Sequence, residues 1–426
     1  MRFFCDFWFA AKKATTKKVN KYSKKVPNES VKFKNDPTQE KRSENAVIAY
    51  TWHHFLNNPT EPNWIILFPM TKAAVRAMDT MTAFVNQHLP QLGCQLDNFL
   101  VFGGSKRCWT TYLTAAMDPI RVKAIVPIVL DAINFVKFLH MQYRKYGAFS
   151  FALSDFIDLN ITMRIDDPNM GLLTQYMDPY YYFDRLTMPK MVINAAMDEL
   201  QHPDDTYNWW NELPEPKNFL LIPNAEHSMA TGLYEALPAI AAFAISKFLD
   251  KPLPQFSWTR NDDTVNAWWA YSCGINTWDN NKPRRDFRLI NTDIQYGGKC
   301  YCGNSLANNS LCANLASLWN SQTIQPTVVN GNRTYTISYR DFNPPSNGTW
   351  IAYMIDFKFE NPYKLDMDMR EYNRLLKEIR NKRGAQFIGI PEDVEEFLEF
   401  TTDVAIWPNT YPYSPCLGES CGVRMV

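Results

Sequence analysis

The sequence lacks a net charge, and it also lacks any long apolar run. Lys and Arg together number 44, and Asp and Glu together number 44, so the formal net charge at pH 7 is zero. A neutral chain has no overall field that attracts nucleic acid or an anionic membrane, and we expect neither as a partner. No stretch reaches the roughly 18 consecutive apolar residues that span a bilayer. The sequence therefore predicts a soluble protein without a transmembrane segment.

Cysteine is scarce in the first 270 residues and concentrated after them. Three cysteines come early, at Cys5, Cys94 and Cys108, and six come late, at Cys273, Cys300, Cys302, Cys312, Cys416 and Cys421. An even set in a loop-rich region favours disulfides, whereas a Cys-x-Cys pair also suits zinc. Because no histidine follows Cys273, a zinc site there is expected to be all-thiolate, which makes disulfides the preferred interpretation. Glycosylation sequons at Asn28, Asn160, Asn308, Asn332 and Asn347 also favour a secreted, extracellular protein.

The amino terminus is a weak match to an export signal, because Asp6 interrupts the apolar run of residues 1–11. Residues 12–46 are rich in Lys, Asn, Ser and Glu and have no periodic apolar face. We interpret residues 1–46 as a basic leader of low order.

The middle of the chain alternates between short apolar runs and amphipathic stretches. At 426 residues and 46% hydrophobic content, the chain can form one large α/β core and a second, smaller domain. The apolar runs predict strands at 99–102, 124–130, 191–195 and 219–222. Helices are predicted at 47–57, from Thr71 as N-cap, after Gly103-Gly104, from Pro203 and at 229–249. This alternation predicts a doubly wound, mostly parallel sheet over residues 47–252.

Two regions depart from that alternation. Residues 131–189 carry aromatic and proline-containing patches and are predicted to be a cap insertion over the carboxyl edge of the sheet. From residue 256 to 426, short alternating stretches such as 334–339 and 350–359 predict a smaller antiparallel β-sandwich domain. Within it, residues 364–383 are expected to form an exposed charged helix, and the cysteine-containing loops are expected to be disulfide-rich.

The segment Gly103-Gly104-Ser105 combines a strand end, a tight turn and a helix start. That order is typical of a nucleophile elbow, in which a serine sits on a strained turn and the helix amino terminus favours developing negative charge. Arg107 stands where the usual G-x-S-x-G motif has its second glycine. A helix-capping role for Ser105 is the alternative.

Asp198 and His227 follow the predicted strands 191–195 and 219–222. Loops at the carboxyl ends of parallel strands gather at one edge, so we expect Ser105, Asp198 and His227 to meet as nucleophile, acid and base. Glu199 and Asp131 are alternative acids, and Asp198 as a helix cap or His227 as a loop residue are the structural alternatives. The residue after the nucleophile, Lys106, is assigned to the oxyanion hole. Arg107 is more readily an ion-pair partner in the core than a binder of anionic substrate.

The strings GGSKRCWTTYLTAAMDP, NAAMDEL, IPNAEHSM, PRRDFR and FTTDVAIWPNTYPY closely resemble the PhoPQ-activated pathogenicity-related family, from about residue 26 to the end. The family includes a secreted autocrine proliferation repressor of social amoebae. The resemblance implies an α/β-hydrolase-like domain followed by a β-sandwich, a secreted or periplasmic setting, and Ser105, Asp198 and His227 at the triad positions. Relatives carry a further segment before the part that matches Val26, including the first sheet strands. We therefore expect those strands and the loop with the second oxyanion N–H to be missing.

Two functions follow from these observations. The first is a secreted serine hydrolase that acts on an ester or amide, with a small-molecule or peptide substrate and with no cofactor and no metal. The second is a non-catalytic extracellular regulator that uses a hydrolase scaffold to bind a cell-surface receptor. A zinc-binding carboxyl-terminal module is a third, weaker hypothesis.

Overall fold

In a computed structural model of the 426-residue chain, the structure describes residues 30–34, 36–92, 96–250, 264–273, 283–292, 300, 302–306, 310–343, 349–360 and 397–422. The predicted charged helix at 364–383 and most of the predicted leader lie outside these residues. Among the described residues, no helix has the length and apolarity that a membrane crossing requires.

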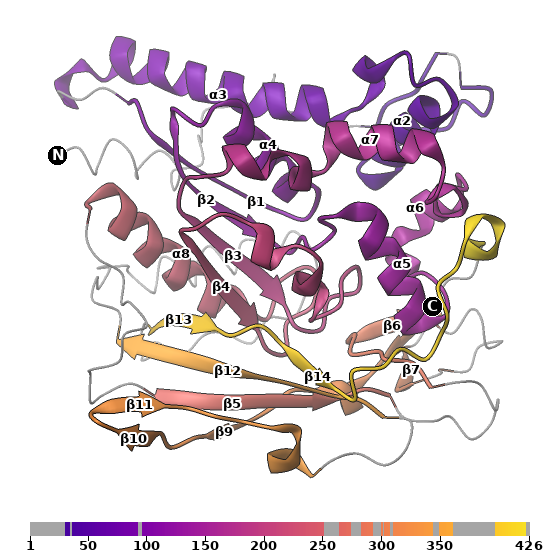
Figure 1. Ribbon diagram of the computed structural model, residues 1–426. Coiled ribbons are helices and arrows are strands. Elements are labelled where there is room, and N and C mark those ends of the chain that lie inside the picture. Colours follow the sequence, from indigo (N-terminus) through magenta and orange to yellow (C-terminus); the bar gives the residue numbers. More distant parts are fainter. Residues whose placement is uncertain are drawn as a thin grey trace.

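A four-stranded parallel sheet forms the centre of the α/β part (Figure 1). Its strands run in the order β1-β2-β3-β4, and each is hydrogen-bonded in parallel to its neighbours. The bounds are β1 Phe99–Gly104, β2 Val122–Ile128, β3 Lys190–Ala195 and β4 Lys217–Ile222. All four strands predicted from apolar runs are therefore confirmed, and their carboxyl ends lie at one edge.

Helices cover both faces of this sheet (Figure 1). On one face, α3 (Leu67–His88) packs on α4 (Lys106–Met117), α4 packs on β1 and β2, and α2 (Asn45–Asn57) adds Trp52 and Phe55 to the same core. On the other face, α8 (Leu233–Phe248) contributes alanines and Phe243 to a second core beneath β2 and β3. Sequence and structure agree on this three-layer arrangement.

Two helix predictions need correction. Helix α3 begins at Leu67 rather than after Thr71, and the Thr71 hydroxyl donates to the Leu67 carbonyl at 2.8 Å from within the helix. The helix predicted from Pro203 is wrong: this segment forms two short 3₁₀ turns, η8 (Asp205–Asn208) and η9 (Trp210–Glu212). Asp205 accepts the backbone N–H of His202 at 2.7 Å and binds the Lys145 ammonium, so these tertiary contacts override the local helix signal.

Residues 131–189 are helical. They form α5 (Phe135–Tyr146), α6 (Ser154–Ile157) and α7 (Pro168–Met177), together with the 3₁₀ turns η5 (Phe151–Leu153), η6 (Thr162–Arg164) and η7 (Pro179–Arg185). Two further 3₁₀ turns, η3 (Pro62–Trp64) and η4 (Pro90–Leu92), flank α3. The role of 131–189 as a cap and the proposed domain boundaries stay predictions.

The carboxyl-terminal part is antiparallel, as predicted. Its largest sheet has the order β13-β12-β5-β9, with β14 paired to β12, and it packs against α8 and β4 through Val265, Phe357 and Phe400. A sheet of order β6-β8-β7 and a β10-β11 hairpin complete it. The bounds are β5 Thr264–Tyr271, β6 Ile290–Thr292, β7 Asn304–Leu306, β8 Leu311–Ala313, β9 Asn320–Thr323, β10 Thr327–Val329, β11 Asn332–Thr334, β12 Ile351–Glu360, β13 Phe397–Thr401 and β14 Ala405–Trp407, with 3₁₀ turns η11 Leu315–Ser317, η12 Tyr339–Phe342 and η13 Gly418–Cys421.

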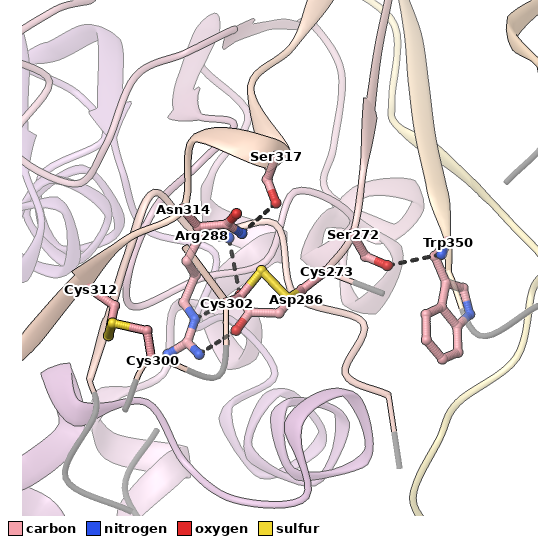
Figure 2. Close-up of a disulfide and its surroundings, with 10 residues drawn as sticks. All are labelled: Ser272, Cys273, Asp286, Arg288, Cys300, Cys302, Cys312, Asn314, Ser317 and Trp350. Carbon is pink, nitrogen blue, oxygen red and sulfur yellow. Dashed lines mark hydrogen bonds and ion pairs between the residues drawn. A yellow bond between two sulfur atoms is a disulfide. The ribbon is translucent and has the colours of Figure 1, made fainter. Parts of the chain in front are cut away.

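All six late cysteines are paired, as the sequence favoured. The disulfides are Cys273–Cys302, Cys300–Cys312 and Cys416–Cys421. Figure 2 shows the first two beside the buried Arg288–Asp286 ion pair, whose closest atoms are 2.5 Å apart. The Cys273–Cys302 disulfide therefore links the end of β5 to the residues just before β7.

Candidate active site

Ser105 occupies a strained turn between β1 and α4. Its φ of 57° and ψ of −130° lie outside the regions that residues with a side chain ordinarily adopt, and such strain is typical of a nucleophile elbow. A Cβ at Gly103 would lie 2.7 Å from the Arg107 carbonyl oxygen, so only glycine fits the close approach of strand and helix. The second glycine of the usual motif is replaced by Arg107 without loss of this turn.

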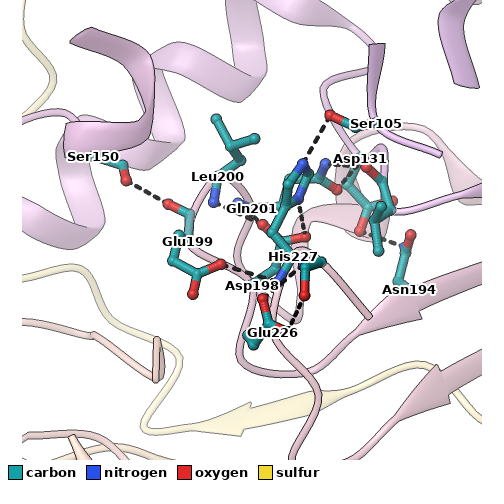
Figure 3. Close-up of polar contacts among 12 residues, drawn as sticks. Ser105, Asp131, Ser150, Asn194, Asp198, Glu199, Leu200, Gln201, Glu226 and His227 are labelled. Atoms are coloured by element: carbon teal, nitrogen blue, oxygen red, sulfur yellow. Dashed lines mark hydrogen bonds and ion pairs between the residues drawn. The ribbon is translucent and has the colours of Figure 1, made fainter. Parts of the chain in front are cut away.

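Ser105, His227 and Asp198 form a continuous hydrogen-bonded series at the carboxyl edge of the parallel sheet (Figure 3). His227 Nε2 lies 2.8 Å from Ser105 Oγ, and His227 Nδ1 lies 2.7 Å from Asp198 Oδ2. Asp198 follows β3 and His227 follows β4, as the strand-end argument predicted. If Nδ1 carries the proton toward Asp198, Nε2 is left to accept the Ser105 hydroxyl.

The Asp198 carboxylate is held on both sides. Its Oδ1 accepts the backbone N–H groups of Leu200 at 2.7 Å and Gln201 at 3.2 Å, while its Oδ2 faces His227. Asp198 is 2% exposed, so this carboxylate has exchanged water for fixed donors. Its orientation toward the imidazole is therefore set by the turn after β3.

The electrostatic surroundings stabilise the protonated form of the His227 ring more than water does. Burial alone lowers the pKa of this imidazole, but the Asp198 charge and its hydrogen bond outweigh burial and raise the pKa above its ordinary value. The His227 side chain is 22% exposed, and Ser105 is half-buried, so the series opens to solvent at its serine end.

The two alternative acids lie beside the series without joining it. The Glu199 carboxylate accepts the backbone N–H of His227 at 2.9 Å, and Asp131 accepts the side-chain amide of Asn194 at 2.7 Å. Burial, and then the Asp198 charge, raise the pKa of Glu199 to about 7. Burial also raises the pKa of Asp131 well above its ordinary value. Of these three carboxylates, Asp198 is the one that lies against a ring nitrogen of His227.

Lys106 and Arg107 both pair with Glu44, a residue that no sequence motif singles out. Lys106 Nζ lies 3.0 Å and Arg107 Nη2 lies 3.3 Å from the Glu44 carboxylate. Arg107 forms an ion pair as predicted, but its side chain is 41% exposed rather than in the core. The Lys106 side chain is thereby engaged. Its backbone N–H is at the first position of α4, where a helix has no carbonyl of its own to pair with it.

Three other histidines have separate partners. His202 contacts Asp204 and the Arg285 carbonyl, His140 contacts Asp166, and His88 lies against the Phe84 ring. None of these partners belongs to the Ser105 series.

Comparison with known proteins gives a consistent set of relatives. The model of the family described as PhoPQ-activated pathogenicity-related protein matches residues 10–288. Autocrine proliferation repressor protein A of Dictyostelium discoideum is 31% identical over 407 residues, which cover 92% of this chain and 71% of that protein.

Among solved structures, an acetyl xylan esterase from Paenibacillus sp. R4 has a TM-score of 0.34 and 15% identity, covering 44% of this chain and 54% of its own. Acetyl xylan esterase 1 from Thermoanaerobacterium sp. JW/SL YS485 has a TM-score of 0.33 and 16% identity, covering 48% and 58% respectively. The chain thus spans little more than half the length of either esterase.

Proposed function

This chain belongs to the PhoPQ-activated pathogenicity-related protein family, and we propose that it is a serine hydrolase that cleaves an ester or amide through an acyl-enzyme. The observation that carries the proposal is the series Ser105–His227–Asp198, with its two contacts of 2.8 and 2.7 Å. Each contact is within the hydrogen-bond reach that general-base catalysis requires.

The roles follow from the geometry. His227 Nε2 takes the Ser105 proton as Oγ attacks the substrate carbonyl carbon, and then gives that proton to the leaving oxygen or nitrogen. Asp198 holds the ring and stabilises the imidazolium that forms. The backbone N–H of Lys106, at the amino terminus of α4, stabilises the negative oxygen of the tetrahedral intermediate. A second attack by water on the acyl-serine, with His227 again as base, completes turnover.

A fluorophosphonate probe tests this assignment on the full chain. We expect covalent labelling of wild-type protein at Ser105 and its loss in Ser105→Ala, with turnover lowered on the order of 10⁴- to 10⁶-fold. Ser228→Ala is the matched control, because this exposed serine adjoins His227 and its hydroxyl donates to Glu226 instead. Folded wild-type protein that resists labelling, or equal labelling of Ser105→Ala, would contradict the proposal.

We also place the protein outside the cytosol. Three disulfides are typical of an oxidising compartment, and the described sequon residues Asn160 and Asn332 are both exposed. Expression in a eukaryotic secretory host should give a glycosylated product whose mass falls on endoglycosidase treatment, and Asn160→Gln should remove one glycan. A product that carries no glycan and has free thiols at all six late cysteines would contradict this placement.

A further inference from the structure

A histidine from α5 meets a cysteine pair from the far end of the chain. One ligand atom each of His140, Cys416 and Cys421 lies within 4.8 Å of the other two. Both cysteines are buried, and His140 is half-buried. The sequence could not indicate this group, because the histidine comes more than 270 residues before the cysteines. The three residues form what we call the α5–tail cluster.

The two ring nitrogens of His140 have the surroundings of a metal-ligating histidine, with one nitrogen on a carboxylate and the other without a hydrogen bond among the described residues. Its Nε2 lies 2.9 Å from Asp166 Oδ1, and the other oxygen of Asp166 accepts the backbone N–H of Gly418 at 3.3 Å, inside the Cys416–Cys421 turn. Its Nδ1 is buried and makes no hydrogen bond within the described part of the chain. Ligating histidines ordinarily donate their second N–H to a carboxylate, which fixes the tautomer and leaves the other nitrogen for the metal.

The two sulfurs are joined as a disulfide in this structure, and a disulfide offers no thiolate to a metal. We propose that reduction of Cys416–Cys421 converts the α5–tail cluster into a zinc site, with two thiolates and the His140 imidazole as ligands and Asp166 as the residue that positions the ring. Two equivalents of a small thiol reduce the pair to two cysteine thiols and yield one external disulfide. Binding of Zn²⁺ then displaces the two thiol protons.

The chemistry of the ligand set fits zinc. Two thiolates balance the charge of one Zn²⁺, so the buried centre carries no net charge from metal and sulfur ligands. Thiolate and imidazole are ligands that zinc prefers, and a Cys-x4-Cys spacing is within the usual range for zinc ligands. Three protein ligands leave the fourth tetrahedral position to water.

The two states connect the tail differently. The disulfide joins residues five apart and closes a local turn, whereas the zinc site ties that turn to α5. The tail already follows α5, since Tyr413 donates its N–H to the Arg144 carbonyl at 3.2 Å and Arg144 lies 4.1 Å over the Tyr411 ring. Zinc therefore replaces a local link by a long-range one without requiring the tail to move far.

Site-resolved alkylation of the full chain tests the inference. The protein is reduced with a water-soluble phosphine, which becomes the phosphine oxide, then treated with iodoacetamide with and without Zn²⁺, and each cysteine is scored by peptide mass spectrometry. We expect zinc to slow alkylation of Cys416 and Cys421 at least tenfold. The cysteines of the other two disulfides serve as internal controls and are expected to be unaffected.

Variants separate this site from adventitious thiol binding. His140→Gln should abolish the protection, Asp166→Asn should weaken zinc affinity about 10–100-fold, and His54→Gln, which changes a histidine paired with Glu61, should leave both unchanged. With Co²⁺ in place of zinc, reduced wild-type protein should show a thiolate charge-transfer band that is absent before reduction. Equal alkylation with and without zinc, or protection that persists in His140→Gln, overturns the inference.

Discussion

Two histidine–aspartate pairs have aspartates six residues apart in sequence, Asp198 and Asp204, yet the surroundings of the two pairs differ. In the His227–Asp198 pair, the second ring nitrogen faces the Ser105 hydroxyl and the histidine side chain is partly open to solvent. In the His202–Asp204 pair, the second nitrogen lies 2.8 Å from the Arg285 carbonyl, and both side chains are buried. The same residue types thus reach a serine hydroxyl at one place and form a closed network at the other.

The charges around the pairs explain the difference. Asp204 is shared by Lys145 and Arg285 as well as His202, so despite burial its pKa lies well below the ordinary value. Burial, and then the Lys145 charge, lower the pKa of His202. Both ring nitrogens of His202 face acceptors, the Asp204 carboxylate and the Arg285 carbonyl, and neither nitrogen faces a nucleophile. A histidine–aspartate contact indicates catalysis only where the second nitrogen reaches a nucleophile.

The largest expected effect is on turnover, in Asp198→Asn. The amide keeps the shape of the side chain but can no longer stabilise the imidazolium or select the tautomer, and we expect kcat/KM for an ester to fall on the order of 10⁴-fold. The measurement is steady-state hydrolysis, with circular dichroism to establish that the variant is folded. Activity within tenfold of wild type would remove Asp198 from the series.

The next effect is on stability, in Asp204→Asn. This change leaves the buried ammonium of Lys145 and the guanidinium of Arg285 short of a counter-charge, and breaking such a pair costs about 3–5 kcal/mol. Urea unfolding measures the loss, and turnover per folded molecule should be unchanged.

Asp79→Asn is the matched control for that stability change. Asp79 pairs with Arg76 and Arg121 at a partly exposed position, where solvent screens the charges, so we expect a much smaller loss of stability. Equal destabilisation by the two variants would show that the buried network is no more important to the fold than a surface pair.

The strands and the placement of the Ser105 series could be predicted, because they depend on local sequence pattern. The four strands were visible as apolar runs, and the ends of β1, β3 and β4 placed Ser105, Asp198 and His227 at one edge, because parallel strands have a common carboxyl end. What could not be predicted depends on side-chain direction and on contacts distant in sequence. Glu44 reaches Lys106 from the N-cap of α2, and Arg285 reaches Asp204 from beyond β5.

In the segment after Pro203, contacts distant in sequence made a local prediction wrong. Its local pattern favoured a helix, yet Asp204 and Asp205 are bound by Lys145, whose helix α5 lies nearly 60 residues earlier. No periodicity within the segment carries that information. Similarly, Asp198 and Glu199 are adjacent in sequence, and only their opposite directions decide that one faces the imidazole ring and the other the backbone of His227.

The smallest expected effect is in Glu199→Gln, which tests how the Glu199 carboxylate influences the neighbouring His227–Asp198 pair. Because burial and the Asp198 charge raise the pKa of Glu199 from 4.5 to about 7, the folded state holds this proton more tightly than the unfolded chain does. The corresponding stability is fully present below pH 4.5 and is lost as pH rises through about 7. We expect wild-type protein to lose up to about 3 kcal/mol of unfolding free energy across this window, and Glu199→Gln, which cannot ionise, to lose less.

The same variant should shift the pH dependence of activity. Ionised Glu199 helps to raise the pKa of His227, so its neutral replacement lowers that pKa and moves the acid limb of the kcat/KM profile to lower pH. The maximal rate should change by less than about tenfold, because the glutamine oxygen can still accept the His227 N–H. An acid limb that stays in place while stability alone changes would mean that Glu199 supports the loop of His227 without influencing the charge of its ring, as the closed network around His202 supports the fold.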